Sequence, residues 1–153
     1  MVPHRGVLSV TARFEQVTEQ TIRHLVDAFY ERVRRDSTLG PIFAAAITED
    51  AWPEHLAKMY AFWSSVMLTS GRYKGDPVGA HRKVTGVEPP MFGTWLDLFE
   101  ATARELFVAE IAESSACKAR RIAESLKLAL FFRPDRSWPE DLRLRPKLST
   151  PCA

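Results

Sequence analysis

The spacing of hydrophobic residues predicts a chain built from helices. Residues 1–17 have weak periodicity and are expected to form a loose arm, and then apolar residues recur at the three- and four-residue intervals of an α-helix. This first stripe consists of Ile22, Leu25, Val26, Phe29, Tyr30 and Val33. Thr18 is a suitable N-cap for the helix, which is expected to stop near Asp36-Ser37. The segment Leu39-Gly40-Pro41-Ile42-Phe43 should then form a tight corner closed by an aromatic residue.

The next two helices each carry a histidine. One helix is expected to have Asp50 as its cap and Trp52 and Pro53 in its first turn, where a proline is tolerated. Its hydrophobic stripe includes His55, Met59, Phe62, Trp63 and Val66, so one histidine lies on an otherwise apolar face. After a loop over residues 71–75, Asp76 can cap a short helix in which Pro77 takes the first position. His81 then follows about one turn later.

Two longer helices are expected to complete the domain. After a loop from Val84, the longest helix opens at Pro89-Pro90 and buries Phe92, Trp95, Leu96, Phe99, Ala103, Leu106 and Phe107. Ser114 or Ser115 can cap the last helix, which ends at Arg133-Pro134 and has the stripe Ala119, Ile122, Ala123, Leu126, Ala129 and Leu130. Residues 133–153 are rich in proline and charge and are expected to be a mostly disordered tail. The sequence contains no strand pattern, internal repeat or glycine-rich phosphate loop, so the fold class is all-α.

Length and charge restrict the possible functions. A chain of 153 residues suits one domain with one core, and a net charge of +2 is too small to indicate nucleic-acid binding. No apolar run approaches the ~20 residues that cross a bilayer, and Met1–Val10 lacks the apolar core of a signal peptide. Cys117 and Cys152 form neither a metal-binding pattern nor a disulfide framework. Two unpaired thiols are ordinary in a reducing compartment, so a cytoplasmic location is expected.

The aromatic residues give the first indication of a ligand. Seven of them fall on predicted inner faces or at the corner: Phe29, Tyr30, Phe43, Phe62, Trp63, Phe92 and Trp95. Such residues often serve only as core, but Tyr30 and Trp95 also bring an O–H and an N–H inward, and His55 adds a third polar group. Buried donors need partners, so the combination indicates a polar guest. His81, beside two small residues, suits ligation of a large flat group, although that stretch alone is more typical of a surface histidine.

These residues resemble a known family, the truncated haemoglobins, and in particular the bacterial two-on-two globins of group III. The resemblance runs from about Phe14 to Phe132 and implies an N-terminal arm over 1–13, a globin domain over 14–132 and a tail over 133–153. It rests on Phe29-Tyr30-Glu31-Arg32-Val33, Leu39-Gly40-Pro41-Ile42-Phe43, Trp52-Pro53-Glu54-His55, Phe62-Trp63, Gly75-Asp76-Pro77…His81 and Trp95-Leu96-Asp97-Leu98-Phe99. The absence of a Gly-Gly pair from the sequence is also similar to group III.

The resemblance implies a two-on-two helical sandwich around haem b, iron protoporphyrin IX. His81 matches the proximal iron ligand, and Tyr30, His55 and Trp95 match the distal residues. The pocket-lining residues would be Phe43, Met59, Phe62, Trp63 and Phe92. A neutral imidazole is a common haem ligand, which agrees with the pattern around the short helix. The candidates for pairing with the haem propionates are Arg72, Lys74, Arg82 and Lys83, of which Arg72 and Lys74 are included in the predicted site.

The implied function is binding of O₂ and other diatomic ligands, NO and CO, in oxygen transport or nitric-oxide chemistry. An alternative is a haem enzyme, a nitric-oxide dioxygenase or reductase or a peroxidase-like protein. Because the sequence has no reductase domain or flavin motif, such an enzyme would need a reductase partner as electron donor. A second alternative is a haem-free helical interaction domain. A di-iron bundle would require paired Glu-x-x-His motifs, which the sequence lacks.

Overall fold

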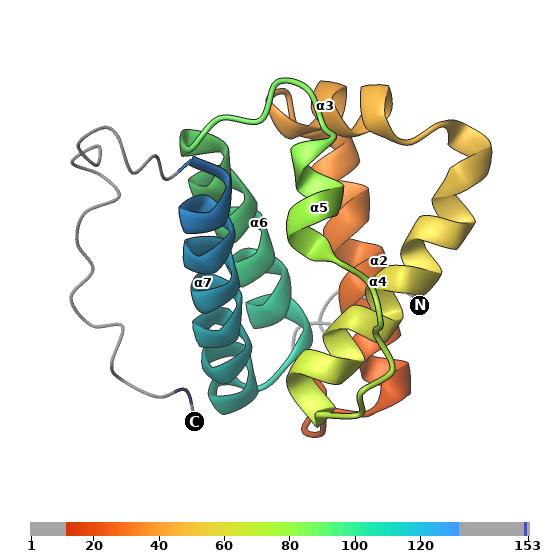
Figure 1. The fold of residues 1–153 in the computed structure, drawn as a ribbon. Helices are drawn as coiled ribbons and strands as arrows, with labels where there is room; N and C mark the ends of the chain where they lie inside the picture. Colours follow the sequence, from red (N-terminus) through yellow and green to blue (C-terminus); the bar gives the residue numbers. More distant parts are fainter. Residues whose placement is uncertain (1–11, 132–151, 153) are drawn as a thin grey trace.

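The computed structural model describes residues 12–131 and Cys152, and within them helices account for all the regular structure (Figure 1). The predicted all-α fold class is therefore confirmed. A single isolated bridge between Phe14 and Phe107 is the one β-type pairing in this part of the chain. The elements in order are α2 (Glu19–Arg35), α3 (Leu39–Ala46), the short 3₁₀ helix η1 (Glu49–Ala51), α4 (Trp52–Leu68), α5 (Pro77–Arg82), α6 (Pro90–Leu106) and α7 (Ala109–Phe131).

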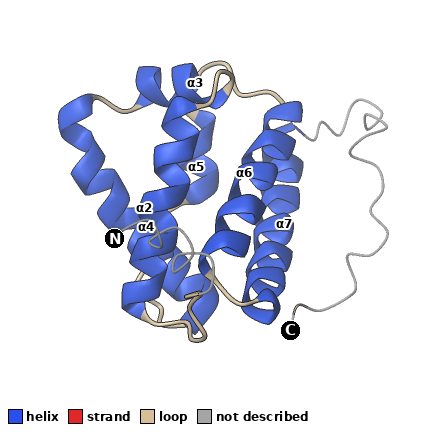
Figure 2. Cartoon of the chain, turned by 180° about the vertical axis from the view of Figure 1, so that it is seen from behind, coloured by secondary structure: helices blue, strands red, loops and turns tan. Residues whose placement is uncertain are grey.

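The helices form two layers, α2 with α4 and α6 with α7, and α2 joins the layers by packing on both α4 and α6. Figures 1 and 2 show the short α5 between the two layers, where it packs against α7. A hydrogen bond between side chains also joins the layers, because the guanidinium of Arg32 on α2 donates to the hydroxyl of Thr102 on α6 at 3.1 Å. This arrangement places α5, the helix that carries His81, between the two layers.

Helix α2 begins and ends as the sequence predicts. The hydroxyl of Thr18 accepts from the backbone N–H of Thr21 at 3.1 Å, and the Thr21 hydroxyl accepts from the Thr18 N–H at 2.8 Å. This reciprocal capping box satisfies two free donors of the first turn. The helix ends at Asp36, and its predicted stripe is buried throughout. Both the cap and the stripe are confirmed.

The expected corner at Leu39–Phe43 is wrong, because these residues form the first half of α3. The Asp36 carboxylate accepts from the N–H groups of Thr38 and Leu39 at 2.9 and 2.8 Å, which starts a new helix directly after α2. Gly40 permits this close succession, since a Cβ there would lie 2.7 Å from the carbonyl oxygen of Arg34. The two helices are consequently joined by only three residues, Asp36 to Thr38.

Two predicted helix starts are also wrong. Helix α4 begins at Trp52, because the turn η1 precedes it, and Asp50 instead accepts from the hydroxyl of Thr48 at 2.8 Å. Helix α7 begins at Ala109, well before Ser114 and Ser115, so it is α7 and not α6 that is the longest helix of the described chain. Both serines lie inside α7, where Ser115 is buried.

The early start of α7 depends on a distant segment of the chain. The N–H of Phe14 donates to the carbonyl of Leu106 at 2.7 Å, and the Val108 N–H donates to the Phe14 carbonyl at 3.0 Å. These bonds end α6 and turn the chain directly into α7. The expectation of a loose arm over residues 1–17 is therefore wrong at Phe14, whereas residues 1–11 lie outside the described part.

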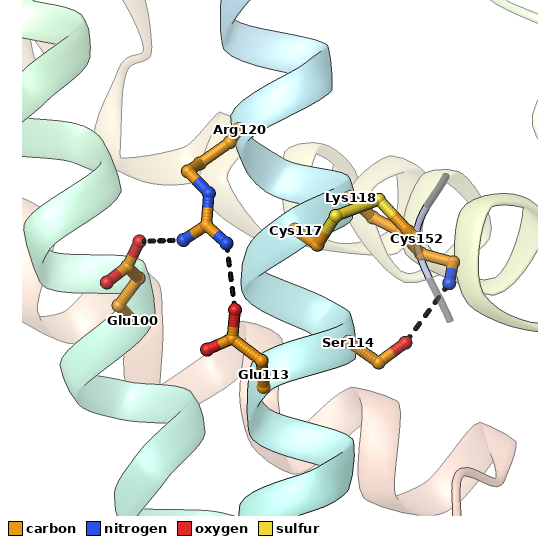
Figure 3. Close-up of a disulfide and its surroundings, with 7 residues drawn as sticks. All are labelled: Glu100, Glu113, Ser114, Cys117, Lys118, Arg120 and Cys152. Atoms are coloured by element: carbon orange, nitrogen blue, oxygen red, sulfur yellow. Dashed lines mark hydrogen bonds and ion pairs between the residues drawn. A yellow bond between two sulfur atoms is a disulfide. The ribbon is translucent and has the colours of Figure 1, made fainter. Parts of the chain in front are cut away.

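Across the same α6–α7 pair, Arg120 bridges Glu100 and Glu113 at 2.7 and 2.9 Å (Figure 3).

The expectation of two unpaired cysteines is wrong. Cys117 on α7 forms a disulfide with Cys152, and their Cα atoms are 5.7 Å apart (Figure 3). The cysteines are 35 residues apart in the sequence, so no short spacing motif indicates the pairing. The argument from free thiols to a cytoplasmic location consequently loses its basis. The predicted disordered tail otherwise falls on residues 132–151 and 153, which lie outside the described residues.

None of the helices in the described ranges is both long and apolar enough to cross a membrane.

Candidate functional site

The histidine of α5 is held in a fixed orientation by the start of its own helix. The Asp76 carboxylate accepts from the N–H of Gly79 at 3.1 Å, and Pro77 occupies the first turn, so the predicted cap and helix are confirmed. The Nδ1 atom of His81 lies 2.7 Å from the Pro77 carbonyl oxygen. A carbonyl can only accept, so Nδ1 carries the proton and Nε2 keeps its lone pair free for a metal ion.

Two glycines allow the chain to close tightly before this histidine. A Cβ at Gly79 would lie 2.3 Å from Oδ2 of Asp76, so a larger residue there would force the capping carboxylate to shift. A Cβ at Gly75 would lie 2.4 Å from the Tyr73 hydroxyl. Tyr73 in turn is fixed to α4, because its N–H donates to Ser65 at 2.9 Å. The loop between α4 and α5 therefore has a defined path.

On the other side of the site, Tyr30 from α2 meets His55 from α4. Their ring centroids are 5.4 Å apart and the planes are perpendicular. Phe43 packs on the Tyr30 ring at 5.9 Å, so three of the residues singled out in the sequence are brought together. Trp52 joins them at 5.2 Å from His55 and 6.0 Å from Tyr30. Sequence reasoning missed Trp52 as a site residue, although a tryptophan starting the stripe that contains His55 was a usable signal.

One polar atom of this cluster is buried and unsatisfied. Nε2 of His55 is buried without a hydrogen-bond partner in the described chain. Tyr30 is 6% exposed, and burial raises the pKa of its phenol, which therefore stays protonated. Burial lowers the pKa of His55, and the charges of Lys58 and His81 lower it further. The pair therefore combines a neutral imidazole, whose Nε2 a polar guest would satisfy, with a protonated phenol.

An aromatic wall continues from Tyr30 toward α6. Phe29 contacts both Tyr30 and Trp95, with centroid distances of 4.9 and 5.5 Å. Trp95 stacks on Trp63 at 6.3 Å and on Phe99 at 5.9 Å. Met59 and Phe62 are partly buried and pack against the same core. Phe92 lies in a second cluster with Ala123 and Leu126, against which Trp95 also packs, so Trp95 connects the two.

The basic residues proposed for the propionates have different surroundings. Arg72 forms an ion pair with Glu19, whose other carboxylate oxygen accepts from the buried Ser64 at 2.8 Å. Arg82 donates to the Ala129 carbonyl on α7 at 3.2 Å. Lys74 and Lys83 are exposed. The pairing of Arg72 and Lys74 with propionates remains a prediction.

A two-layer helical fold with an imidazole prepared for metal ligation on α5 and a phenol–imidazole pair on α2 and α4 is the arrangement of a haem globin. The sequence profile of the bacterial-like globins matches residues 13–127. The chain therefore belongs to this family, and within it to the truncated haemoglobins of group III.

Two comparisons with individual proteins support this placement. The chain is 34% identical over 121 residues to the group 3 truncated haemoglobin ctb of Campylobacter jejuni, which covers 78% of this chain and 95% of that protein. The crystal structure of the group III truncated haemoglobin from Campylobacter jejuni matches with a TM-score of 0.73 and 34% identity, again over 78% of this chain and 95% of the other.

The residues present fit a haem group. The free Nε2 of His81 is a suitable iron ligand, and Nε2 of His55 is a buried polar atom that has no hydrogen-bond partner among the described residues. Burial leaves the Tyr30 phenol protonated and the His55 imidazole neutral, so the site offers hydrogen-bond donors without fixed charge. Sequence reasoning identified most of these side chains and missed Trp52.

Proposed function

We propose that this chain binds haem b through His81 and holds a diatomic ligand, O₂ in the first place and also NO or CO, beside Tyr30, His55 and Trp95. The observation that carries the proposal is the 2.7 Å contact between His81 Nδ1 and the Pro77 carbonyl. A ligating histidine usually donates its second N–H in this way, which fixes the tautomer and raises the basicity of the free nitrogen. When bound, the haem iron supplies reversible coordination of the diatomic molecule.

The apolar side chains exclude water and hold the flat macrocycle. We assign this role to Phe43, Met59, Phe62, Trp63 and Phe92, and we assign the propionates to Arg72 and Lys74. Trp63 is 1% exposed and stacks on Phe99 at 4.7 Å, so the wall behind the site is rigid. Arg72 already pairs with Glu19. Its proposed role therefore requires that it pair with a propionate in addition to Glu19 or in exchange for it.

The distal residues supply hydrogen bonds to the bound ligand. Tyr30 is buried and protonated, so its hydroxyl can donate, and the Trp95 indole N–H is a donor at every pH. His55 is neutral because burial lowers its pKa, so it can donate or accept through one nitrogen. A donor set without fixed charge suits a ligand that becomes partly negative when bound. Ligand binding needs only the haem and the residues that hold it and its ligand, whereas reductive turnover of NO or peroxide would also need an external electron donor.

An absorption spectrum of the purified protein tests the proposal. We expect a Soret band, a five-coordinate ferrous form, and distinct spectra after addition of O₂, CO and NO. His81→Ala should abolish the histidine-bound ferrous spectrum. His24→Ala is the matched control, because His24 is exposed on α2. Its ring packs near Phe14, with the two ring centroids 5.3 Å apart. A wild-type protein that takes up no haem after reconstitution would instead favour a helical interaction domain.

A further inference from the structure

A groove of about 490 Å³ lies between α2 and α4, on the outer side of the Tyr30–His55 pair. Its base contains the buried Tyr30 and Trp52, which are 6% and 4% exposed, together with the partly buried Leu56. Its rim is formed by exposed side chains that include Asp27 and Arg34. The groove therefore opens to solvent at one end and reaches residues of the candidate site at the other.

One layer of rings separates the groove from the distal site. Tyr30 and Trp52 both line the groove, and both also contact the His55 imidazole, with centroid distances of 5.4 and 5.2 Å. The Nε2 atom of His55 is buried and unpartnered. A small molecule that passed between these two rings would thus come directly to the polar atoms of the site.

The Trp52 ring is held in place from the surface. The guanidinium carbon of Arg34 lies 4.4 Å from the Trp52 ring centroid, which is a cation–π contact. The same guanidinium forms an ion pair with Glu49 in η1, the turn that directly precedes Trp52. Phe43 packs nearly parallel to the indole at 6.4 Å. Arg34 and Glu49 should therefore restrict the movement of Trp52, one of the two rings that separate the groove from the distal site.

We propose that this groove is the path by which an uncharged diatomic ligand reaches the distal site, and that Arg34 and Glu49 act as a latch on Trp52, the side chain that closes the path. The inference rests on the proposed function. Trp52 and Arg34 are positioning residues, because neither contacts the ligand in its bound place. Their role is to set how often the layer of rings opens.

A latch has a kinetic signature that a ligand-contacting residue lacks. Opening the path more often raises the rates of ligand arrival and departure by the same factor, so the equilibrium affinity stays constant. A residue that stabilises the bound ligand changes mainly the departure rate. A surface cation–π contact is weak, so we expect its loss to raise both rates by roughly two- to five-fold.

The decisive variant is Arg34→Gln, studied by flash photolysis of the CO complex of the haem-loaded full chain. CO association and dissociation should both accelerate about two- to five-fold, the CO affinity should not change, and less CO should recombine before leaving the protein. Leu56→Phe, which fills the base of the groove, should slow both rates. Unchanged rates in Arg34→Gln would overturn the proposal, and so would a changed affinity.

Arg23→Gln is the matched control. Arg23 makes the same type of contact from the same helix, 4.4 Å from the ring of Tyr60, which also lines the groove. Among the described ring contacts, however, Tyr60 has none with His55, so it is not part of the layer that closes the path, and its hydroxyl donates to Asp27. Its CO kinetics should match those of the wild type. Equal acceleration in both variants would show that the general charge of this face, and not the latch, governs access.

A second measurement does not depend on CO binding. In protein labelled with 5-fluorotryptophan, the ¹⁹F resonance of Trp52 can be assigned by its loss in Trp52→Phe. Arg34→Gln should shift this resonance and increase its solvent isotope effect, while Arg23→Gln should leave it in place. An unmoved resonance would overturn the latch even if haem binds as proposed. A wild-type chain without a Soret band would instead refute the proposed function, and the access path with it.

Discussion

The imidazole of His81 donates from Nδ1 to the carbonyl oxygen of Pro77 over 2.7 Å, so the residue that opens α5 orients the residue near its end. Because α5 is only six residues long, the capping interaction and the histidine are parts of one small unit. Any change that loosens the first turn should therefore alter the orientation of the ligating ring.

Substitution of Asp76 should test this coupling. Asp76→Ala removes the acceptor of the Gly79 N–H and should cost about 1 kcal/mol of stability, whereas Asp76→Asn keeps a good cap. In the ferrous haem protein, Asp76→Ala should broaden or shift the iron–histidine stretching band in the resonance Raman spectrum. Gly79→Ala should do the same, because its Cβ would lie 2.3 Å from the Asp76 carboxylate. An identical band in all four proteins would mean that the cap does not orient His81.

The partly buried His55 should make the haem-free protein sensitive to acid. Its pKa is lowered in the folded state, mainly by burial and further by the charges of Lys58 and His81, so below about pH 6.5 the unfolded chain binds the proton more readily than the folded one. The free energy of unfolding should thus fall as the pH drops from 7.5 to 5.5. Urea unfolding of His55→Leu should show a smaller fall. If both proteins lose the same stability, other groups cause the acid sensitivity.

The disulfide between Cys117 and Cys152 should not affect the haem site. Cys117 lies on α7, whereas the candidate distal residues lie on α2, α4 and α6, so Cys117→Ser should keep the wild-type haem spectrum. A chain shortened to end at Asp135, which lacks Cys152, should keep it as well. Mass spectrometry of the unreduced full chain should find the two cysteines linked. A free thiol at Cys117 would show that the pairing does not form, and a changed spectrum would show that the chain end supports the site.

Local signals explain which parts of the fold could be predicted. The cap at Thr18, the stripe of α2 and the Asp76-Pro77 start of α5 involve residues within a turn or two of each other. The start of α7 could not be predicted, because it depends on hydrogen bonds between Phe14 and the Leu106–Val108 turn. The corner at Leu39 contains residues typical of a break, but the Asp36 carboxylate, which caps Thr38 and Leu39, turns it into a helix.

In the candidate site, too, local sequence signals identified some residues, whereas others depend on contacts between distant segments. Tyr30 and His55 were identified because each is a polar residue on an apolar stripe, and their contact at 5.4 Å follows from the packing of α2 on α4. Trp52 was missed, since its partners Arg34 and Phe43 come from other helices and nothing near it in the sequence indicates them. The Arg72–Glu19 pair likewise joins segments that are distant in the chain.

Tyr30 and Trp95 should stabilise bound O₂ much more than bound CO. Bound O₂ gains partial negative charge, so each donated hydrogen bond to it is worth roughly 1.5–3 kcal/mol, and loss of one should speed O₂ release about ten-fold or more. Tyr30→Phe is the cleaner test, because it removes the hydroxyl and keeps the ring contacts with Phe29 and His55.

Trp95→Phe should also speed O₂ release, but it opens space beside Trp63 and Phe99, on which the indole stacks, so packing contributes to its effect. Stopped-flow measurement of O₂ and CO release from the wild type and both variants separates the two causes. We expect CO release to change far less than O₂ release in Tyr30→Phe, with a smaller contrast in Trp95→Phe. Equal acceleration for both gases in Tyr30→Phe would mean that the shape of the pocket, and not hydrogen bonding, retains the ligand.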